Sequence, residues 1–108
     1  MTTPRPGRAV RGSKTGRPVM ALLDLLGRRT CLRILWELRA QRLSFRALQE
    51  AAQTNPSVLN TRLTELRAVG IVNQGAAGYG LTAQGQSLIA ALAPITQWAT
   101  RWVPKPQE

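Results

Sequence analysis

The chain lacks histidine altogether and has one cysteine and five acidic residues in a length of 108. Histidine is the commonest general base and metal ligand, so its absence argues against acid–base catalysis and a transition-metal site. The lone Cys31 excludes an internal disulfide and a multi-thiolate metal cluster. Since the acids form no paired-carboxylate pattern and no nucleophile–base pair stands out, we expect a protein that is not an enzyme and uses no metal or cofactor.

Long apolar runs are also missing. The first apolar run, PVMALLDLL at residues 18–26, is short and contains Asp24, so neither a secretory signal nor a membrane-spanning helix is predicted. A length of 108 residues suits one domain. The scarcity of cysteine fits a reducing compartment, and we expect a cytoplasmic protein that does not bind membranes.

Positive charge is what the chain has in excess. Lysine and arginine number 15 against five acids, for a formal net charge of +10, and 13 of the 15 are arginines. The planar arginine fork matches phosphate groups and guanine edges better than lysine does. This balance indicates a polyanionic partner, but charge alone does not choose among DNA, RNA and an anionic membrane surface.

The first 17 residues, MTTPRPGRAVRGSKTGR, carry a cation at every third position: Arg5, Arg8, Arg11, Lys14 and Arg17. Because proline and glycine are frequent and apolar surface is scarce, burial cannot offset the entropy of ordering, and we predict a disordered basic arm over residues 1–17. Two roles fit this arm. It is either a solvated tail that aids solubility or a segment that follows phosphates or enters the minor groove of DNA.

Three helices are predicted before residue 53. Pro18 and Gly27 bracket the first, over residues 18–26. The second starts at residue 28 or 30, ends at residue 40 and has Cys31 on its apolar face. After a short extended piece at residues 41–43, Ser44 is a favourable N-cap for the third helix, over residues 45–52.

A fourth helix is predicted to begin at Asn55-Pro56, because asparagine is a favoured N-cap and proline suits the first turn, and to end at Val69 before Gly70. Its leucines share one face. The opposite face and its flanks hold short polar side chains and two arginines, which leaves room to approach base edges in a major groove. A merely solvated helix, the alternative, would more often show Glu/Lys pairs four residues apart. The residues predicted to contact DNA are Ser57, Asn60, Thr61, Arg62, Thr64 and Arg67.

Residues 71–82 predict a β-hairpin, with short strands IVNQ and YGLT on either side of the loop GAAG. A hairpin that follows two closely connected helices is the element order of a winged helix-turn-helix. Wings that bind phosphates usually carry arginine or lysine, and this one carries neither. We therefore expect the hairpin to act mainly as scaffold, with at most backbone or Tyr79 contacts to DNA.

A last helix is predicted from Ala83 to about Trp102, before a tail over residues 104–108. It is nearly uncharged, and its apolar residues repeat at spacings of four and three, as in a coiled coil. Pro94 is expected to bend or break it. The apolar band is too broad for so small a domain to cover, so we expect a dimer interface; the alternative is a helix that caps a monomer's core. The interface residues expected here are Leu88, Leu92, Ile95, Trp98 and Trp102.

Four sequence stretches and one tryptophan, in this order, resemble the HxlR-type winged helix-turn-helix regulators, which are related in fold to the MarR group. They are LGRRTCLRILWELR, LSFRALQ, NPSVLNTRLTELRAVGIV, YGLTAQGQSL and Trp98. The resemblance covers roughly residues 27–102 and implies a mainly α fold with a short hairpin wing, and we expect the whole domain to span residues 18–103. It also implies a homodimer joined by the N- and C-terminal helices, which adds Leu22 to the interface. It places Ser57, Asn60, Thr61 and Arg62 among the recognition residues of the fourth helix.

The chain departs from that family's pattern in three places. Many relatives have an oxidant-sensing cysteine just before the first helix, where residues 16–20 have none. The family often has tryptophan where this chain has Thr30, and its wing is usually longer, with proline and arginine. The short wing shifts the expected phosphate contacts toward the basic arm. Cys31 is expected to pack in the core and to have low reactivity. The alternative is redox sensing, because the nearby Arg28 and Arg29 would favour the thiolate.

We therefore expect a sequence-specific transcription regulator in the nucleoid that binds double-stranded DNA as a homodimer on an inverted repeat, with repression as the expected effect. One alternative is a nonspecific architectural or chromatin-type binder, for which deletion of residues 1–17 would nearly abolish binding. Another is a winged-helix protein-interaction module without DNA affinity at moderate salt. The sequence identifies no small-molecule effector.

Overall fold

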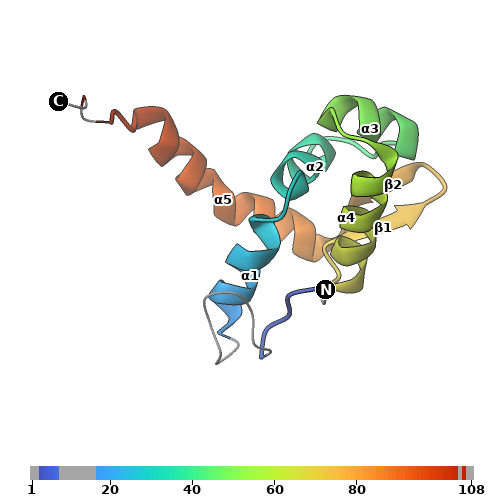
Figure 1. Cartoon of the computed structure of the whole chain (residues 1–108), viewed down its shortest axis with the longest axis horizontal. Helices are drawn as coiled ribbons and strands as arrows, with labels where there is room; N and C mark the ends of the chain where they lie inside the picture. Colours follow the sequence, from blue (N-terminus) through green and yellow to red (C-terminus); the bar gives the residue numbers. More distant parts are fainter. Residues whose placement is uncertain (1–2, 8–16, 105, 107–108) are drawn as a thin grey trace.

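The computed structural model describes residues 3–7, 17–104 and 106, in which five helices and one β-hairpin are formed. In chain order they are α1 (Pro18–Leu26), α2 (Cys31–Leu38), α3 (Phe45–Ala52), α4 (Pro56–Ala68), β1 (Val72–Gly75), β2 (Gly78–Leu81) and α5 (Ala83–Arg101). Figure 1 shows α2, α3, α4 and the hairpin gathered into one body, from which α5 extends. The expected mainly α, winged helix-turn-helix architecture is confirmed.

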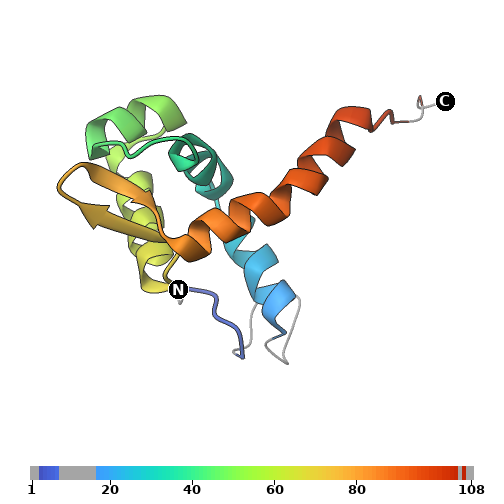
Figure 2. The same ribbon diagram turned by 180° about the vertical axis from the view of Figure 1, so that it is seen from behind.

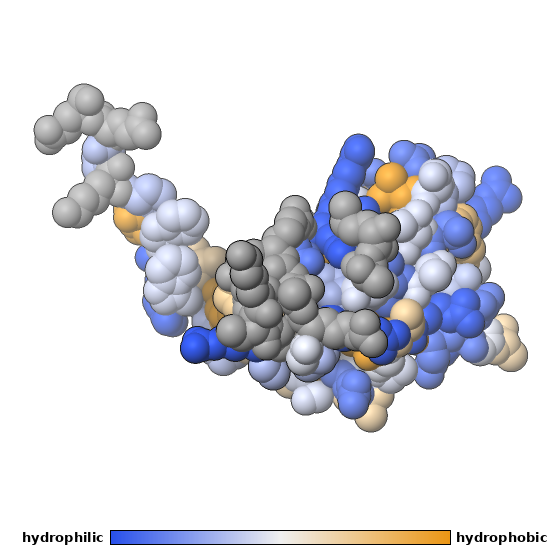
Figure 3. All heavy atoms as spheres, turned by 60° about the horizontal axis from the view of Figure 1, so that its bottom comes forward, coloured by the Kyte–Doolittle hydropathy of each residue, from blue (hydrophilic) through white to orange (hydrophobic). Residues whose placement is uncertain are grey.

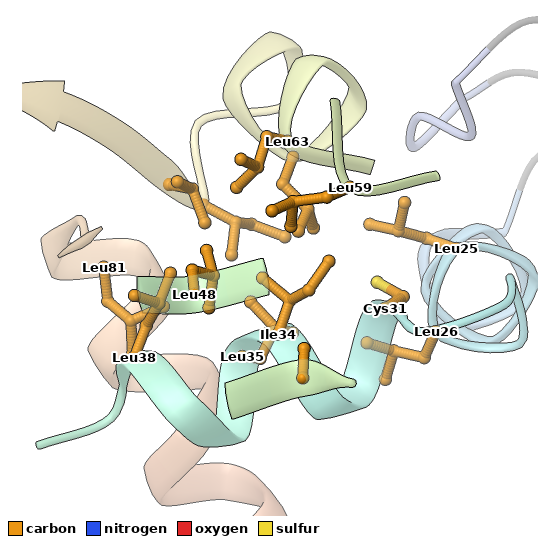
Figure 4. Packing of buried hydrophobic residues seen from close by; sticks show 14 residues of the cluster. Leu25, Leu26, Cys31, Ile34, Leu35, Leu38, Leu48, Leu59, Leu63 and Leu81 are labelled. Atoms are coloured by element: carbon orange, nitrogen blue, oxygen red, sulfur yellow. The ribbon is translucent and has the colours of Figure 1, made fainter. Parts of the chain in front are cut away.

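The hydrophobic core lies between α2 and the pair α3–α4. Ile34 and Leu35 of α2 are fully buried, and Leu59 and Leu63 of α4 point toward them (Figure 4). Burial of these apolar side chains is the main favourable term that holds α4 against the body. The remaining members of the cluster are Leu25, Leu26, Cys31, Leu38, Leu48, Ala52, Leu66, Ile71, Val72 and Leu81.

Side-chain caps start three of the helices, and the sequence predicts two of them. The Ser44 hydroxyl accepts a hydrogen bond from the Ala47 amide at 3.1 Å, which begins α3. Asn55 caps α4 in the same way, as expected. Thr82 caps α5 by accepting from the Gly85 amide at 3.1 Å. These bonds satisfy amides that have no partner inside the helix.

The hairpin is antiparallel, with Val72 opposite Leu81 and Gly75 opposite Gly78, and a two-residue turn joins the strands. Leu43 adds one further bridge to Tyr79, so the predicted extended piece at residues 41–43 lies along the hairpin. Gly78 has a φ of +103°, and a Cβ there would collide with the backbone of Leu43. Glycine is therefore required where the hairpin meets this segment.

Helix α5 runs without interruption from Ala83 to Arg101 and passes through Pro94, so the possibility of a break is wrong. Proline removes the hydrogen bond to the carbonyl four residues earlier. That residue, Ala90, is exposed, and water can satisfy its carbonyl. The outer half of α5 projects away from the body, as both ribbon views show (Figure 2), and the molecule measures 51 × 32 × 26 Å along its principal axes.

Candidate nucleic-acid interface

Helix α4 presents one buried and one exposed face. Asn55 accepts a hydrogen bond from the Val58 amide at 2.9 Å, and Pro56 occupies the first turn, so the helix starts where the sequence predicts. Leu59, Leu63 and Leu66 are buried. Five of the six residues predicted to contact DNA are exposed: Ser57, Asn60, Thr61, Thr64 and Arg67.

Hydrogen bonds within α4 determine what this exposed face offers to a ligand. The Thr61 hydroxyl donates to the Ser57 carbonyl at 3.0 Å, and the Thr64 hydroxyl donates to the Asn60 carbonyl at 2.8 Å. Both threonines therefore have their hydroxyl protons engaged and present oxygen lone pairs and methyl groups. The Asn60 amide makes no hydrogen bond to another described residue, so its donor and acceptor are both available. This combination matches the amino groups, acceptors and thymine methyls of a major groove.

Arg62, the sixth residue predicted to contact DNA, is partly buried and does not lie on the exposed face of α4. Its Nε donates to the Arg29 carbonyl at 2.9 Å, and its Nη1 pairs with Glu65. Glu65 is buried and also pairs with Arg28, which lies 3.7 Å from Asp24. A buried carboxylate needs cationic partners, and this need turns Arg62 toward the α1–α2 turn and away from the exposed face.

A groove of about 450 Å³ lies between the end of α4 and strand β1. Arg67 supplies its positive charge, and the exposed amides of Asn73 and Gln74 line the opposite side. Such donors are those that commonly contact phosphate and sugar groups. The other lining residues are Thr64, Ala68 and Val72.

Arg42 gives the hairpin the cation that its own sequence lacks. Its Nη2 donates to the Asn73 side-chain oxygen at 2.7 Å and to the Gly78 carbonyl at 2.8 Å. A Cβ at Gly80 would collide with the Arg42 guanidinium, so that glycine makes room for it. Sequence reasoning missed Arg42 because it lies 31 positions before Asn73. The only signal was a glycine within a strand, which often marks the close approach of another group.

The N-terminal segment meets the C-terminal end of α4. Arg5 donates from Nη2 to the Ala68 carbonyl at 2.8 Å, and Pro4 is buried. An arginine at this position satisfies a helix carbonyl that lacks an intrahelical partner. The structure therefore gives residues 3–7 a defined place, although the sequence predicted disorder for the whole of residues 1–17. Arg17 is exposed beside α1, and Arg8, Arg11 and Lys14 lie outside the described residues.

The apolar residues predicted to form a dimer interface divide into two groups. Leu22, Leu88 and Leu92 are half-buried and pack against the protein's own core. The others, Ile95, Trp98 and the C-cap residue Trp102, are 57–61% exposed on the outer half of α5 and at its end, which stand clear of the body in Figure 3. On α1, the exposed residues are Val19 and Leu23 in place of Leu22, because the helix turns Leu22 inward.

A groove of about 650 Å³ continues the exposed apolar surface of α5 onto α2. Leu32 and Trp36 line it from α2, and Ile95 lines it from α5. Arg39 stacks on the Trp36 ring at 3.7 Å from the ring centroid. Leu32 and Trp36 are 50% and 45% exposed, so this part of α2 is an unfilled apolar surface in a single chain.

The Cys31 side chain is fully buried and points into the core cluster between α1 and α2 (Figure 4). Burial raises the pKa of the Cys31 thiol from 9.0 to about 11, and the nearby Arg62 and Arg28 only partly oppose this shift. Such a thiol is protonated and inaccessible at neutral pH.

Two other kinds of feature are absent from the described ranges. No helix there is long and apolar enough to cross a membrane. Residues 3–7, 17–104 and 106 also contain no cluster of three or more cysteine and acidic side chains that could hold a metal ion.

The sequence of the chain matches one family of known proteins. The family model described as HxlR-like helix-turn-helix matches residues 25–107. The chain belongs to the HxlR-like helix-turn-helix family. HxlR-like proteins are transcription regulators that bind DNA, and the chain is accordingly a DNA-binding transcription regulator.

Two solved structures share the fold of this HxlR-like chain. Quinone-bound YodB from B. subtilis superposes with a TM-score of 0.73 and 27% sequence identity, over 78% of this chain and 97% of YodB. Reduced HlyU from Vibrio cholerae N16961 gives a TM-score of 0.59 and 26% identity, over 71% of this chain and 86% of HlyU. A search of curated protein sequences finds no match.

Proposed function

We propose that this protein is a homodimeric repressor in the cytoplasm, where it binds an inverted-repeat operator in the nucleoid DNA. The observation that carries the proposal is the exposed face of α4, on which Asn60 keeps its amide available while Thr61 and Thr64 present acceptors and methyl groups. A face of this chemistry discriminates base pairs, whereas a surface for nonspecific binding needs only cations.

Phosphate contacts come from groups on either side of this face. Arg67 lies in the groove between α4 and β1, and Arg42 lies on the hairpin. We propose that both contact the DNA backbone and fix the position of α4 in the groove. The Nε and Nη1 groups of Arg62 are engaged by the Arg29 carbonyl and by Glu65 and turn it away from the exposed face, so we do not propose it as a base contact.

The second copy is proposed to cover the exposed apolar surface of α5 and α1. Ile95, Trp98 and Trp102 form one continuous stripe, and Trp98 stacks on Trp102 with ring centroids 5.5 Å apart. The groove between α2 and α5 extends this stripe. A two-fold dimer would set its two α4 helices about 34 Å apart, one turn of B-DNA, and thus select two half-sites in inverted orientation. Occupancy of such a site excludes other proteins from it, which is why repression is the proposed effect.

Selection of binding sites from a random duplex pool at about physiological salt tests this function. Enrichment of an inverted repeat whose half-sites lie about one helical turn apart is the expected result. Retention of DNA without an enriched motif would favour the architectural alternative. If the protein retained no DNA, the result would favour the alternative of a winged-helix protein-interaction module.

Regulation is tested separately, with the selected operator placed in a promoter that drives a reporter gene. Repression predicts that reporter output falls when the protein is expressed and recovers when the operator half-sites are scrambled. A rise in output that depends on the same half-sites would identify an activator and contradict the proposed sign of regulation.

A further inference from the structure

The four charged residues that join α1 to α4 have no part in the DNA contacts proposed above. They are Asp24 of α1, Arg28 in the α1–α2 turn, and Arg62 and Glu65 of α4, and we call them the α1–α4 ion cluster. Arg28 pairs with both carboxylates, Arg62 pairs with Glu65, and Arg62 also donates to the Arg29 carbonyl at 2.9 Å. The cluster therefore connects the recognition helix to α1 and to the turn after it.

The cluster is buried, which makes stability an insufficient explanation for it. The side chains of Asp24 and Arg28 are each 6% exposed, that of Glu65 is 10% exposed and that of Arg62 is 19% exposed. Removing charges from water costs free energy that their mutual attraction often fails to exceed, so apolar residues can hold two helices together equally well. Ion pairs and hydrogen bonds differ from apolar contacts in being directional. Buried charges can thus fix one relative orientation of two elements.

The backbone next to the cluster is held in an unusual conformation. Thr30 has a φ of +72°, in the left-handed region that β-branched residues rarely adopt. Such a conformation persists only where the surrounding structure imposes it. The adjacent Arg29 carbonyl is the one that Arg62 binds. Arg62 of the recognition helix is therefore attached to a constrained turn and not to a mobile loop.

Helix α1 faces the proposed partner with its other side. Val19 and Leu23 are 57% and 56% exposed, while Asp24, next to Leu23 in sequence, is directed into the cluster. A chain of contacts thus runs from the proposed dimer surface through α1 and the cluster to α4. In a dimer, the same contacts would set the direction of each α4 relative to the two-fold axis.

We propose that Arg62 and Glu65 are positioning residues that fix the orientation of α4 relative to the dimer axis and so determine which half-site spacing the protein accepts. This inference rests on the proposed dimeric function. In this proposal the cluster controls the geometry of DNA binding and does not itself contact the bases. The inference predicts that loss of the cluster relaxes spacing selectivity while recognition of a single half-site is retained.

The test uses the full chain and the operator obtained by selection, in versions with one base pair inserted or deleted between the half-sites. One inserted pair rotates the second half-site by about 35°. Arg62→Met removes the outer link but keeps the bulk and leaves Glu65 paired with Arg28. Glu65→Gln removes the central charge, and Glu50→Gln is its matched control, because Glu50 is exposed on α3 and its change alters net charge equally. Folding and dimerisation are checked by circular dichroism and sedimentation.

We expect wild type and Glu50→Gln to lose about tenfold in affinity on the inserted operator and Arg62→Met to lose about twofold, with single half-site affinity unchanged. Glu65→Gln is expected to behave like Arg62→Met if it folds; if it does not fold, Arg62→Met decides. A folded, dimeric Arg62→Met that keeps the wild-type spacing penalty overturns the inference alone. Equal losses on half-site and full operator overturn it too, because they make Arg62 a base contact. A wild type without spacing preference overturns the proposed dimeric function as well.

Discussion

Cys31 is the only residue in the chain with thiol chemistry, and its surroundings disfavour the use of that chemistry. It is fully buried in the core, and burial raises its pKa to about 11. Two arginines lie close enough to lower the pKa, yet desolvation has the larger effect. The packing role expected from the sequence therefore fits the surroundings better than redox sensing does.

Cys31 should resist thiol reagents in the native protein. At about pH 8, we expect labelling by a disulfide reagent to be slower by several orders of magnitude than in the urea-unfolded chain, because the native thiol is buried and protonated. Rapid labelling of Cys31 in the native protein would contradict this and would support a role as a redox sensor.

The raised pKa of Cys31 also predicts how the stability of the protein depends on pH. As the pH rises from 9.0 to about 11, the Cys31 thiol loses its proton in the unfolded chain but keeps it in the folded protein. Deprotonation then stabilises the unfolded chain, and the contribution of Cys31 to the free energy of unfolding falls.

Thr30 stores local strain that glycine would relieve. Its φ is +72°, and its side chain makes no capping hydrogen bond for α2. Thr30→Gly is expected to raise the free energy of unfolding by about 1 kcal/mol, after allowance for the greater freedom of glycine in the unfolded chain. Urea unfolding measures this, with Thr30→Val as the control that keeps the strain. A less stable Thr30→Gly protein would show that the threonine side chain has packing contacts that outweigh the strain.

Single arginines show most clearly where sequence reasoning stops. Arg62 looks available for DNA because it lies on the flank of a polar helix face, but a buried Glu65 and the Arg29 carbonyl engage it. Arg42 and Arg5 bind partners 31 and 63 positions away. The destination of a long flexible side chain depends on which acceptors the tertiary fold brings near. Local sequence patterns do not contain that information.

At the scale of elements, the boundaries follow closely from local chemistry. Ser44 and Asn55 start α3 and α4, as expected, and the leucine spacing predicts which face of α4 is buried. Caps and apolar periodicity act within a few residues, so the sequence displays them directly. The continuous α5 is the exception, because the effect of Pro94 depends on whether solvent reaches the preceding turn.

The exposed face of α4 should separate base reading from backbone contact. Asn60→Ala is expected to cost about 1–3 kcal/mol on the operator and to relax discrimination at one base pair, while binding to random DNA changes little. Arg67→Gln is expected to weaken both complexes alike and to reduce the salt slope by about 0.9, the value for one phosphate. Gel-shift titrations at several salt concentrations measure both quantities. A uniform loss for Asn60→Ala would remove it from the base-reading set.

The hairpin depends on Arg42 and Gly80 as a pair. We expect Gly80→Ala to destabilise the protein by about 1–3 kcal/mol, because its Cβ would occupy the position of the Arg42 guanidinium. In an Arg42→Ala background the same change should cost much less, and a double-mutant cycle measures the difference. Gly75→Ala is the matched control, since its Cβ would lie 3.3 Å from Arg42 Nη2, a milder approach. Equal costs of Gly80→Ala in both backgrounds would show that another contact is responsible.

At the scale of the whole molecule, the outer half of α5 projects from the body and carries an exposed apolar surface. Ile95, Trp98 and Trp102 are exposed in the single chain. The net charge of +10 opposes self-association unless such a surface is buried. Apolar surface and projection together would place the proposed second copy at a distance from α4, so that the proposed dimer would leave the exposed face of α4 open.

Trp98→Glu is expected to convert the dimer into a monomer, because a carboxylate would be buried in the apolar interface without a partner. Sedimentation velocity measures the oligomeric state, and operator affinity should fall with it, while half-site affinity persists. Thr100→Glu introduces the same charge two residues later on the opposite side of α5 and should leave the dimer intact. A dimeric Trp98→Glu protein would place the interface elsewhere.

The N-terminal segment bears on where this regulator's functional module begins. The family match starts at residue 25, yet Pro4 is buried and Arg5 binds the last turn of α4. Pro4 and Pro6 line a hollow with Val69 and Ile71, the residues that connect α4 to the hairpin. A chimera assembled from the shared family region alone would therefore expose this apolar surface. It would also leave the C-terminal end of α4 without its hydrogen bond from Arg5. For transplantation into another regulator, the transferable unit is therefore the shared region together with α1 and the preceding N-terminal residues, including 3–7.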